Sequence, residues 1–178
     1  MNTREKILSE TEKFILKNGI SKLTLSKISK QLTISQPAVY KHFKNKDDLL
    51  TTLAHIWLDD KTLSKIFPFA TSGYTAKNEI IHDWLWTLAS SKFAACQETP
   101  DMFALYTTYI AGNPDLGRAH IQDLMESLSA AAEISRDEAG AFLLAFSYFH
   151  HPKIAPQWDD NFQMQFEAVW QLVKNFDK

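Results

Sequence analysis

The side chains with the greatest intrinsic reactivity are Cys96 and the adjacent pair His150 and His151, which by type could form a nucleophile or a metal site. Adjacent residues of a helix point about 100° apart, and Pro152 ends the element there. A metal site needs three or four convergent ligands at suitable spacing, which the sequence lacks. A lone cysteine is more often packed as a small hydrophobic residue. We therefore expect no metal site and no cysteine nucleophile.

Sequence signatures of common enzyme classes are also missing from the chain. It contains no G-x-S-x-G motif, no phosphate-binding glycine loop and no H-E-x-x-H motif. We therefore predict that the protein is not an enzyme and that it uses no cofactor.

A different chemistry, contact with DNA, is indicated by the segment after Ser35. Ser35 is a good helix N-cap, Pro37 suits the first helical turn, and Val39 and Phe43 give this segment a buried side. The positions that face away from that side are Gln36, Pro37, Ala38 and Lys41, with Tyr40 and His42 at its flank. Gln can bind adenine through two hydrogen bonds, and Ala or Pro can contact a thymine methyl group. Tyr, Lys and His are suited to phosphates.

Two earlier segments complete a three-helix head. Apolar residues at helical spacing predict a helix over residues 3–17, which Asn18-Gly19 ends, with Gly19 at a left-handed position. Thr24 can cap a second short helix whose inward positions include Leu25 and Ile28. Two short helices joined by a three-residue turn and braced by a first helix form a helix-turn-helix, whose second helix lies in the major groove of DNA.

The distribution of charge supports a nucleic-acid partner for this head. The formal net charge of the 178 residues is −2, but residues 1–53 carry ten Lys or Arg and five Asp or Glu, whereas residues 54–178 carry nine and sixteen. A basic head on an acidic body predicts that the head approaches a polyanion. The alternative explanation is a lysine-rich face that is merely solvated.

The first 50 residues or so resemble the DNA-binding domain of the TetR family of bacterial transcriptional regulators. The most specific part is the continuous string Ser35–Lys46, and matching positions outside it include Ile7, Leu8, Phe14, Gly19, Thr24, Leu25, Ile28, Ile34, Leu49 and Leu50. The resemblance implies that Thr24 and Lys27 meet the DNA backbone and that Ser35, Gln36, Pro37 and Ala38 approach the bases. It further implies phosphate contacts by Tyr40, Lys41, His42 and Lys46. The family usually has Gly where this chain has Thr33, so we expect an altered or strained turn there.

The rest of the chain, residues 47–178, predicts a helical bundle behind a DNA-binding domain of residues 1–46. Asn45 can cap a helix that runs until Pro68 or Gly73 ends it. Further helices are predicted over residues 75–98, 100–111, 114–133, 137–151 and 159–176, with N-caps at Asn113 and Ser135. Valine occurs only three times, which also disfavours strands. The predicted fold class is therefore all-α.

Aromatic residues crowd this predicted bundle. An apolar cavity with a few polar groups is typical of small-molecule pockets, and the resemblance implies that the body binds an inducer that releases DNA. The candidate ligand-binding residues are Trp84, Trp86, Phe103, Tyr106, Tyr109, Phe146 and Phe149. The alternative for each is ordinary core packing.

The two C-terminal segments carry more apolar surface than one bundle requires. Residues 139–149 are apolar nearly all round, and an apolar stripe runs along residues 159–176 as far as Phe176. The resemblance places the last two helices in a four-helix dimer interface, for which the candidates are Phe142, Phe162, Phe166, Val169, Trp170 and Val173. Alternatively, each helix packs only on its own body.

These features together predict a ligand-responsive, sequence-specific DNA-binding transcriptional regulator, acting as a homodimeric repressor on a palindromic operator. Its partners would be double-stranded DNA and an unidentified small-molecule effector. One alternative is a helical small-molecule-binding protein or enzyme with an incidental basic head. Another is a structural DNA-binding protein whose body only oligomerises.

We expect the protein to reside in the cytoplasm, without a membrane partner. The longest unbroken apolar run, Ala141–Phe146, is far shorter than the roughly 18 residues that cross a bilayer. The N-terminus lacks the apolar stretch of a signal peptide, and a single cysteine suits a reducing compartment.

Overall fold

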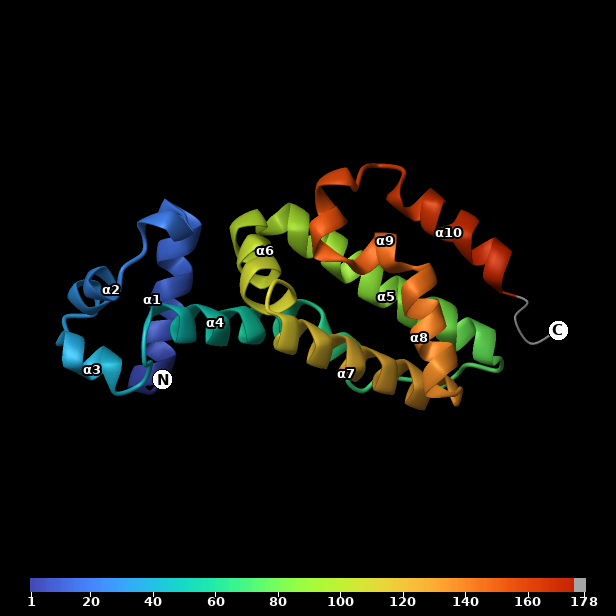
Figure 1. The fold of residues 1–178 in the computed structure, drawn as a ribbon, viewed down its shortest axis with the longest axis horizontal. Coiled ribbons are helices and arrows are strands. Elements are labelled where there is room, and N and C mark those ends of the chain that lie inside the picture. The colour runs from blue at the N-terminus through green and yellow to red at the C-terminus, as the bar shows by residue number, and fades with distance from the viewer. Residues whose placement is uncertain (175–178) are drawn as a thin grey trace.

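The computed structural model describes residues 1–174, in which every regular element is a helix and no strand occurs. The N-terminal head contains α1 (Thr3–Asn18), α2 (Leu25–Gln31) and α3 (Gln36–Tyr40), and α4 (Lys46–Lys61) leads from it into the body. The body contains α5 (Lys77–Glu98), α6 (Pro100–Tyr106), α7 (Pro114–Ala132), α8 (Arg136–Ala145), α9 (Ser147–His150) and α10 (Phe162–Val173). The head lies at one end of an elongated molecule (Figure 1). The all-α prediction is confirmed.

Polar side chains define where the helices begin. Asn45 Oδ1 accepts a hydrogen bond of 2.8 Å from the backbone N–H of Asp48 at the start of α4, and Thr24 and Ser35 cap α2 and α3 in the same way. Asn113 caps α7, and Ser135 forms a capping box with Glu138 at the start of α8. These predicted caps are confirmed. Each capping side chain accepts a hydrogen bond from a backbone N–H group that has no partner within the helix.

The head has a small core of its own. Ile7 and Ile15 of α1, Ile28 of α2, Val39 of α3 and the following Phe43 are almost completely buried. This packing fixes the rotation of α3, because Val39 and Phe43 must face inward and the opposite side of the helix must then face solvent.

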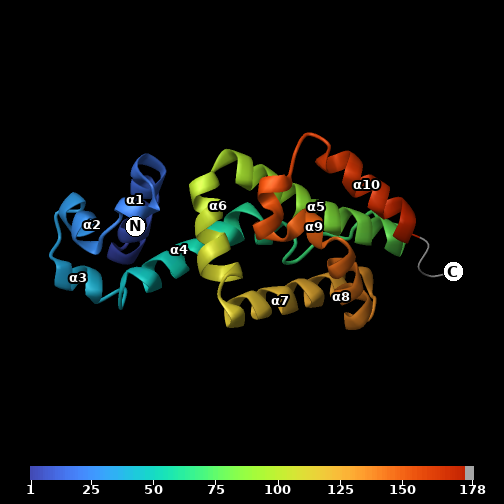
Figure 2. The ribbon, with the colours of Figure 1, turned by 45° about the horizontal axis from the view of Figure 1, so that its top comes forward.

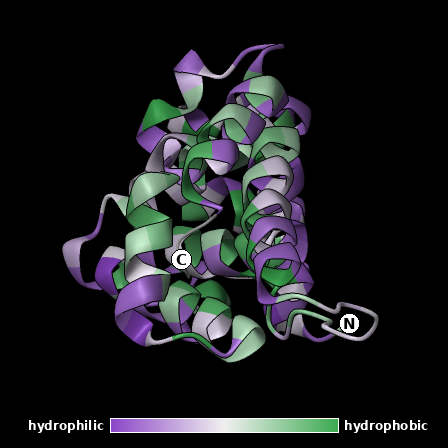
Figure 3. Cartoon of the chain, turned by 90° about the vertical axis from the view of Figure 1, so that its right-hand side faces the viewer, coloured by the Kyte–Doolittle hydropathy of each residue, from purple (hydrophilic) through white to green (hydrophobic). Residues whose placement is uncertain are grey.

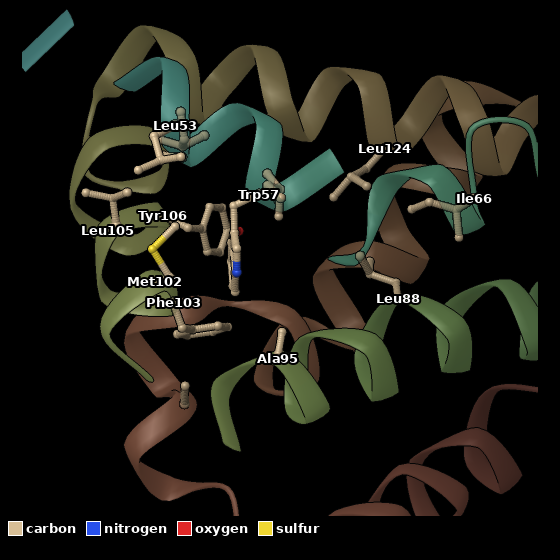
Figure 4. Packing of buried hydrophobic residues seen from close by; sticks show 14 of the residues in the cluster. Leu53, Trp57, Ile66, Leu88, Ala95, Met102, Phe103, Leu105, Tyr106 and Leu124 are labelled. Carbon is tan, nitrogen blue, oxygen red and sulfur yellow. The ribbon is translucent and has the colours of Figure 1, made fainter. Parts of the chain in front are cut away.

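In the body, α5 lies between α7 and α10 in both views of the ribbon (Figures 1 and 2). Hydrophobic and hydrophilic stretches alternate along the helices, as amphipathic packing requires (Figure 3). Helix α4 joins the two units by packing on α6, where the ring of Trp57 lies 6.2 Å from that of Phe103 and 6.5 Å from that of Tyr106 (Figure 4). Contacts with the head and contacts with the body therefore both determine the position of α4.

Several predicted helix boundaries were wrong. Helix α4 ends at Lys61 rather than near Pro68, because Thr62 leaves the helical conformation and the chain turns to bury Ile66 completely. The helix predicted over residues 137–151 is divided at Phe146 into α8 and α9, and α10 begins later than predicted, at Phe162. Phe176, the predicted end of the last stripe, lies outside the described residues.

The helix predicted over residues 100–111 changes its winding part-way along. After α6 the chain forms a π-helical segment at Thr107–Ala111. The hydroxyls of Thr107 and Thr108 each donate a 2.9 Å hydrogen bond to the carbonyl oxygen four residues earlier, an arrangement that bends helices. Gly112 follows, and a Cβ atom there would lie 2.6 Å from the carbonyl oxygen of Thr108, so the segment can end in this way only with glycine.

None of the helices within residues 1–174 combines the length and apolar character needed to span a bilayer.

The turn of the helix-turn-helix contains the strained position that the sequence predicted. Thr33 has a φ of 54°, in the left-handed region that β-branched residues rarely adopt. Gly19 also has a positive φ, of 81°, but its ψ of 156° places it outside the left-handed helical region that was predicted for it.

Replacing Thr33 by Gly should stabilise the protein. Glycine adopts a positive φ without the steric cost borne by other residues, so Thr33→Gly should raise the free energy of unfolding by about 1 kcal/mol. Thr33→Ala is the matched control, because it removes the β-branch but keeps a Cβ atom, and it should give a smaller gain. Urea unfolding of the three proteins measures the difference. A Gly variant no more stable than the unsubstituted protein would contradict this account of the turn.

Candidate functional site

Residues from three parts of the head meet in one open hollow of about 520 Å³. Four of the predicted DNA-contacting residues line it, namely Thr24, Gln36, Tyr40 and Lys46. Ser21 and Asn45 also line it, and neither was predicted to belong to this surface. Asn45 was assigned only its capping role, and Ser21 lies in a short 3-10 turn at Ile20–Lys22 that carries no sequence signal.

The folding of α2 and α3 explains why these side chains gather. Thr24 and Gln36 stand at the N-terminal ends of their helices, and Tyr40 follows Gln36 by four residues on the same side of α3. Tyr40 is 53% exposed although it is a large aromatic residue. An exposed aromatic residue beside an exposed glutamine and a lysine can stack, accept and donate hydrogen bonds, and neutralise a phosphate.

The other predicted DNA-contacting residues do not line this hollow. Ser35, Pro37, Lys41 and His42 are exposed, and Ala38 is half-buried. Lys27 is exposed but directed toward the head itself. Its Nζ donates a 2.7 Å hydrogen bond to the carbonyl oxygen of Lys22 and lies 5.7 Å from the centre of the Phe14 ring.

The body contains a second candidate site, a cavity of about 510 Å³ lined by residues of α5, α6, α7 and α9. Its innermost polar groups are Lys92, Tyr106, His120 and His150, all of them buried. Lys92 Nζ donates hydrogen bonds to the hydroxyl oxygen of Tyr106 at 2.8 Å and to the carbonyl oxygen of His150 at 3.2 Å, and lies 3.4 Å from His120 Nε2. No pattern in the sequence predicted this cluster.

The protonation of the cluster is shifted by its burial. Desolvation lowers the pKa of Lys92 to about 7. Desolvation and the neighbouring Lys92 charge lower the pKa of His150 to about 4, and the same causes lower that of His120. Both histidines are therefore neutral in the folded protein at neutral pH.

Of the seven aromatic residues predicted to bind a ligand, Tyr106 lines this cavity. Trp84, Trp86, Phe146 and Phe149 pack within the body, and Phe103 lines a separate hollow of about 420 Å³ beside Pro152. Tyr109 instead donates a 3.3 Å hydrogen bond to Asp47 in the first turn of α4. Ligand contact by these residues stays a prediction.

The aromatic stripe predicted for a dimer interface faces the chain's own body. Phe142, Phe162, Phe166 and Trp170 are buried, and Val169 and Val173 are half-buried. Trp86 and Phe166 have ring centres 5.0 Å apart, so α10 packs closely on α5. The opposite side of α10 exposes Met164, at 65%, and Leu172, at 85%, and α8 exposes Leu144, at 75%.

Cys96 is a half-buried free thiol. Burial raises the pKa of the Cys96 thiol, which makes it a weaker nucleophile at neutral pH. Within residues 1–174, no three His, Cys, Asp or Glu side chains are grouped so that they could hold a metal ion.

Two family models match this chain. The model described as bacterial regulatory proteins, tetR family, matches residues 7–53, and the model described as tetracyclin repressor-like, C-terminal domain, matches residues 78–170, which is more than half of the chain. The chain belongs to the TetR family. The residues that line the hollow of the head lie within the first match, and those that line the body cavity lie within the second.

Similar proteins place the chain among TetR-family structures. The solved structure of BioQ with its natural double-stranded DNA operator has a TM-score of 0.64 and 20% identity, over 98% of this chain and 99% of that one. The structure of TetR from Acinetobacter baumannii AYE has a TM-score of 0.65 and 18% identity, over 100% of both chains. At such identities the likeness shows a shared TetR-family fold.

In sequence, the chain is 35% identical over 51 residues to an uncharacterized HTH-type transcriptional regulator from Haemophilus influenzae. The alignment covers 29% of this chain and 27% of that protein, so the chain spans well under half of that relative's length.

The buried histidines should make the TetR-family fold sensitive to acid. Below a pH of about 6.5 the histidines of the unfolded chain bind protons, whereas buried His150 stays neutral down to a pH of about 4. The free energy of unfolding should therefore fall as the pH falls through this range, by up to about 1.4 kcal/mol per pH unit for each such histidine. Urea unfolding at several pH values measures this slope. His150→Gln should reduce it, and an unchanged slope would contradict the assignment.

Proposed function

We propose that this TetR-family protein is a sequence-specific DNA-binding transcriptional regulator, acting as a homodimer whose DNA affinity responds to a small molecule in the body. Residues 1–46 would form the DNA-binding domain, and residues 47–178 the regulatory and dimerisation domain. The protein would act in the cytoplasm as a repressor on a palindromic operator, where it competes with polymerase for promoter DNA.

The observation that carries the proposal is the convergence of Thr24, Gln36, Tyr40 and Lys46 in one hollow on a basic head. Lys46 and the hydroxyls of Thr24 and Tyr40 suit phosphate oxygens, and Gln36 at the exposed start of α3 suits a base edge. The solved complex of BioQ with its operator supports this use of the fold, since the structural similarity covers 98% of this chain.

Exposed apolar residues on α8 and α10 support a dimer. Leu144 on α8 and Leu172 on α10 lie on the sides that face away from the chain's own core, and a monomer gains nothing by exposing them. A twofold dimer places two copies of α3 on one DNA duplex, and two recognition helices in successive major grooves read a palindrome with half-sites about 34–36 Å apart.

A chain of contacts between the body cavity and the head supports the proposal that DNA affinity responds to a ligand. Tyr106 lines the cavity and contacts Trp57 of α4, while Tyr109, three residues further, donates its hydrogen bond to Asp47 at the start of α4. Lys46 precedes Asp47 and lines the hollow of the head. A ligand that moves the segment around Tyr106 would therefore move the DNA-contacting end of α4, provided that it binds the two arrangements with different affinity.

Two substitutions in the head should weaken DNA binding in different ways. Lys46→Met removes a phosphate contact, so it should weaken binding to all sequences about equally and reduce the slope of log K against log salt by about one per subunit. Gln36→Ala should instead relax the preference at one base-pair position, at a cost of about 1 to 3 kcal/mol. Fluorescence anisotropy with selected and random duplexes at several salt concentrations separates the two effects.

Lys61→Met is the matched control for this experiment. Lys61 lies at the far end of the same helix, where its Nζ is 3.8 Å from a Glu98 carboxylate oxygen, and the substitution should leave both affinity and slope unchanged. Equal effects of Lys46→Met and Lys61→Met would contradict the proposed interface.

Charged substitutions on the outward faces should dissociate the dimer. Leu144→Glu or Leu172→Glu should weaken dimerisation by about 2 kcal/mol, or roughly thirtyfold, because each places a carboxylate in an apolar interface. Both residues are exposed in the single chain, so thermal stability should not fall as it would after substitution of buried Phe166. Ile56→Glu, at a residue of α4 that is 48% exposed, is the control and should stay dimeric. Sedimentation equilibrium tests this, and an unsubstituted protein that is monomeric at micromolar concentration would contradict it.

A further inference from the structure

The body cavity surrounds a lysine with neutral partners. Lys92 is 1% exposed, and it forms no ion pair with any carboxylate in residues 1–174. Its hydrogen-bond partners, the Tyr106 hydroxyl and the His150 carbonyl, carry no charge. None of the cavity-lining side chains is an Asp or a Glu, although the body as a whole is acidic. An ammonium group at this depth lacks the counterion that buried charges normally require.

A second donor lies beside this lysine. The hydroxyl oxygen of Tyr106 accepts from Lys92 at 2.8 Å, and its own hydrogen has no acceptor among the described residues. Lys92 Nζ is 3.4 Å from His120 Nε2, which is long for a hydrogen bond, so an approaching anion could take over that position. Two donors therefore lie 2.8 Å apart in the lining of the cavity.

The remaining surface of the cavity is mainly apolar. Ile121 and Met125 of α7 and Pro152 after α9 face it, and its volume of about 510 Å³ is within the range of small-molecule sites. Methionine adapts to ligands of different shape. Arg118, exposed on α7, also lines the cavity and adds positive charge for an incoming anion.

We propose that this cavity binds a small carboxylic acid with an apolar body, whose carboxylate accepts hydrogen bonds from Lys92 Nζ and the Tyr106 hydroxyl. The carboxylate supplies the missing counterion, and the apolar body fills the space beside Met125. This inference rests on the proposed function in one respect, because it identifies the bound acid as the effector that would act through Tyr106 on α4.

The proposal includes a pH dependence of known sign. Around Lys92 stand Tyr106 from α6, His120 from α7, and His150 and His151 at the end of α9, with His55 of α4 also acting on His120. None of these groups is an anion at neutral pH. Because the pKa of Lys92 is lowered to about 7 in the empty cavity, a bound carboxylate raises it, and binding at pH 8 takes up a proton.

The test is isothermal titration of the full-length protein, without DNA, using straight-chain carboxylates of four to ten carbons and the primary amide of each. The amide has the same shape without the charge. We expect at least one carboxylate to bind, with at least tenfold higher affinity than its amide. Titration at pH 8 in two buffers of different ionisation enthalpy should show net proton uptake.

Two variants assign the effect to the cavity. Lys92→Met should lower carboxylate affinity at least tenfold while leaving the protein folded, since it replaces a buried cation by an apolar side chain of similar length. Tyr106→Phe keeps the buried ring and should lower affinity by a smaller factor. Lys65→Met is the control, because Lys65 is exposed outside the cavity, with its Nζ 3.3 Å from Ser91 Oγ.

The proposal is overturned if none of the carboxylates binds, if an amide binds as tightly as its acid, or if Lys92→Met binds as tightly as the unsubstituted protein. Each of these results is independent of the head. DNA binding by the ligand-free protein is measured separately, so the failure of either idea leaves the other standing.

Discussion

The packing of α4 against α6 is the contact on which the arrangement of the whole molecule depends. The N-terminal turn of α4 belongs to the head, through the Asn45 cap and the buried Leu49, whereas Trp57 belongs to the body through Phe103 and Tyr106. Protein interiors are close-packed, so α6 cannot shift without moving Trp57 or opening a void. The orientation of the head is therefore tied to the state of the body.

Two tyrosines at the junction of α6 and the π-helical segment extend this arrangement. Tyr106 is turned into the cavity, and Tyr109 reaches Asp47 at the other end of α4. Segments of this kind are frequent at functional sites, because they rotate the side chains that follow relative to those that precede. The buried Lys92 and the half-buried Lys46 then stand at the two ends of one chain of contacts, which would link the proposed anion site in the body to the proposed phosphate site in the head.

Much of this could be predicted from the sequence because it depends on local rules. Caps such as Asn45 and Ser135 and the inward pair Val39 and Phe43 depend on neighbouring residues alone. The buried lysine could not be predicted, since a lysine in an amphipathic helix is normally solvated and the burial of Lys92 is decided by helices distant in sequence. The sequence also left open which side of α10 packs on the body. Phe166 and Leu172 are both apolar and lie on different sides of this helix, and only tertiary packing decides that Phe166 is buried and Leu172 is exposed.

The most direct test of the central claim is selection from a pool of random double-stranded DNA by the full-length protein, followed by sequencing. A homodimer that reads DNA through α3 should enrich one inverted repeat, with half-site centres about 10 base pairs apart or a multiple of that spacing. The Gln36→Ala variant should enrich the same repeat with one symmetric pair of positions relaxed. A folded, dimeric protein that enriches no sequence would contradict the account.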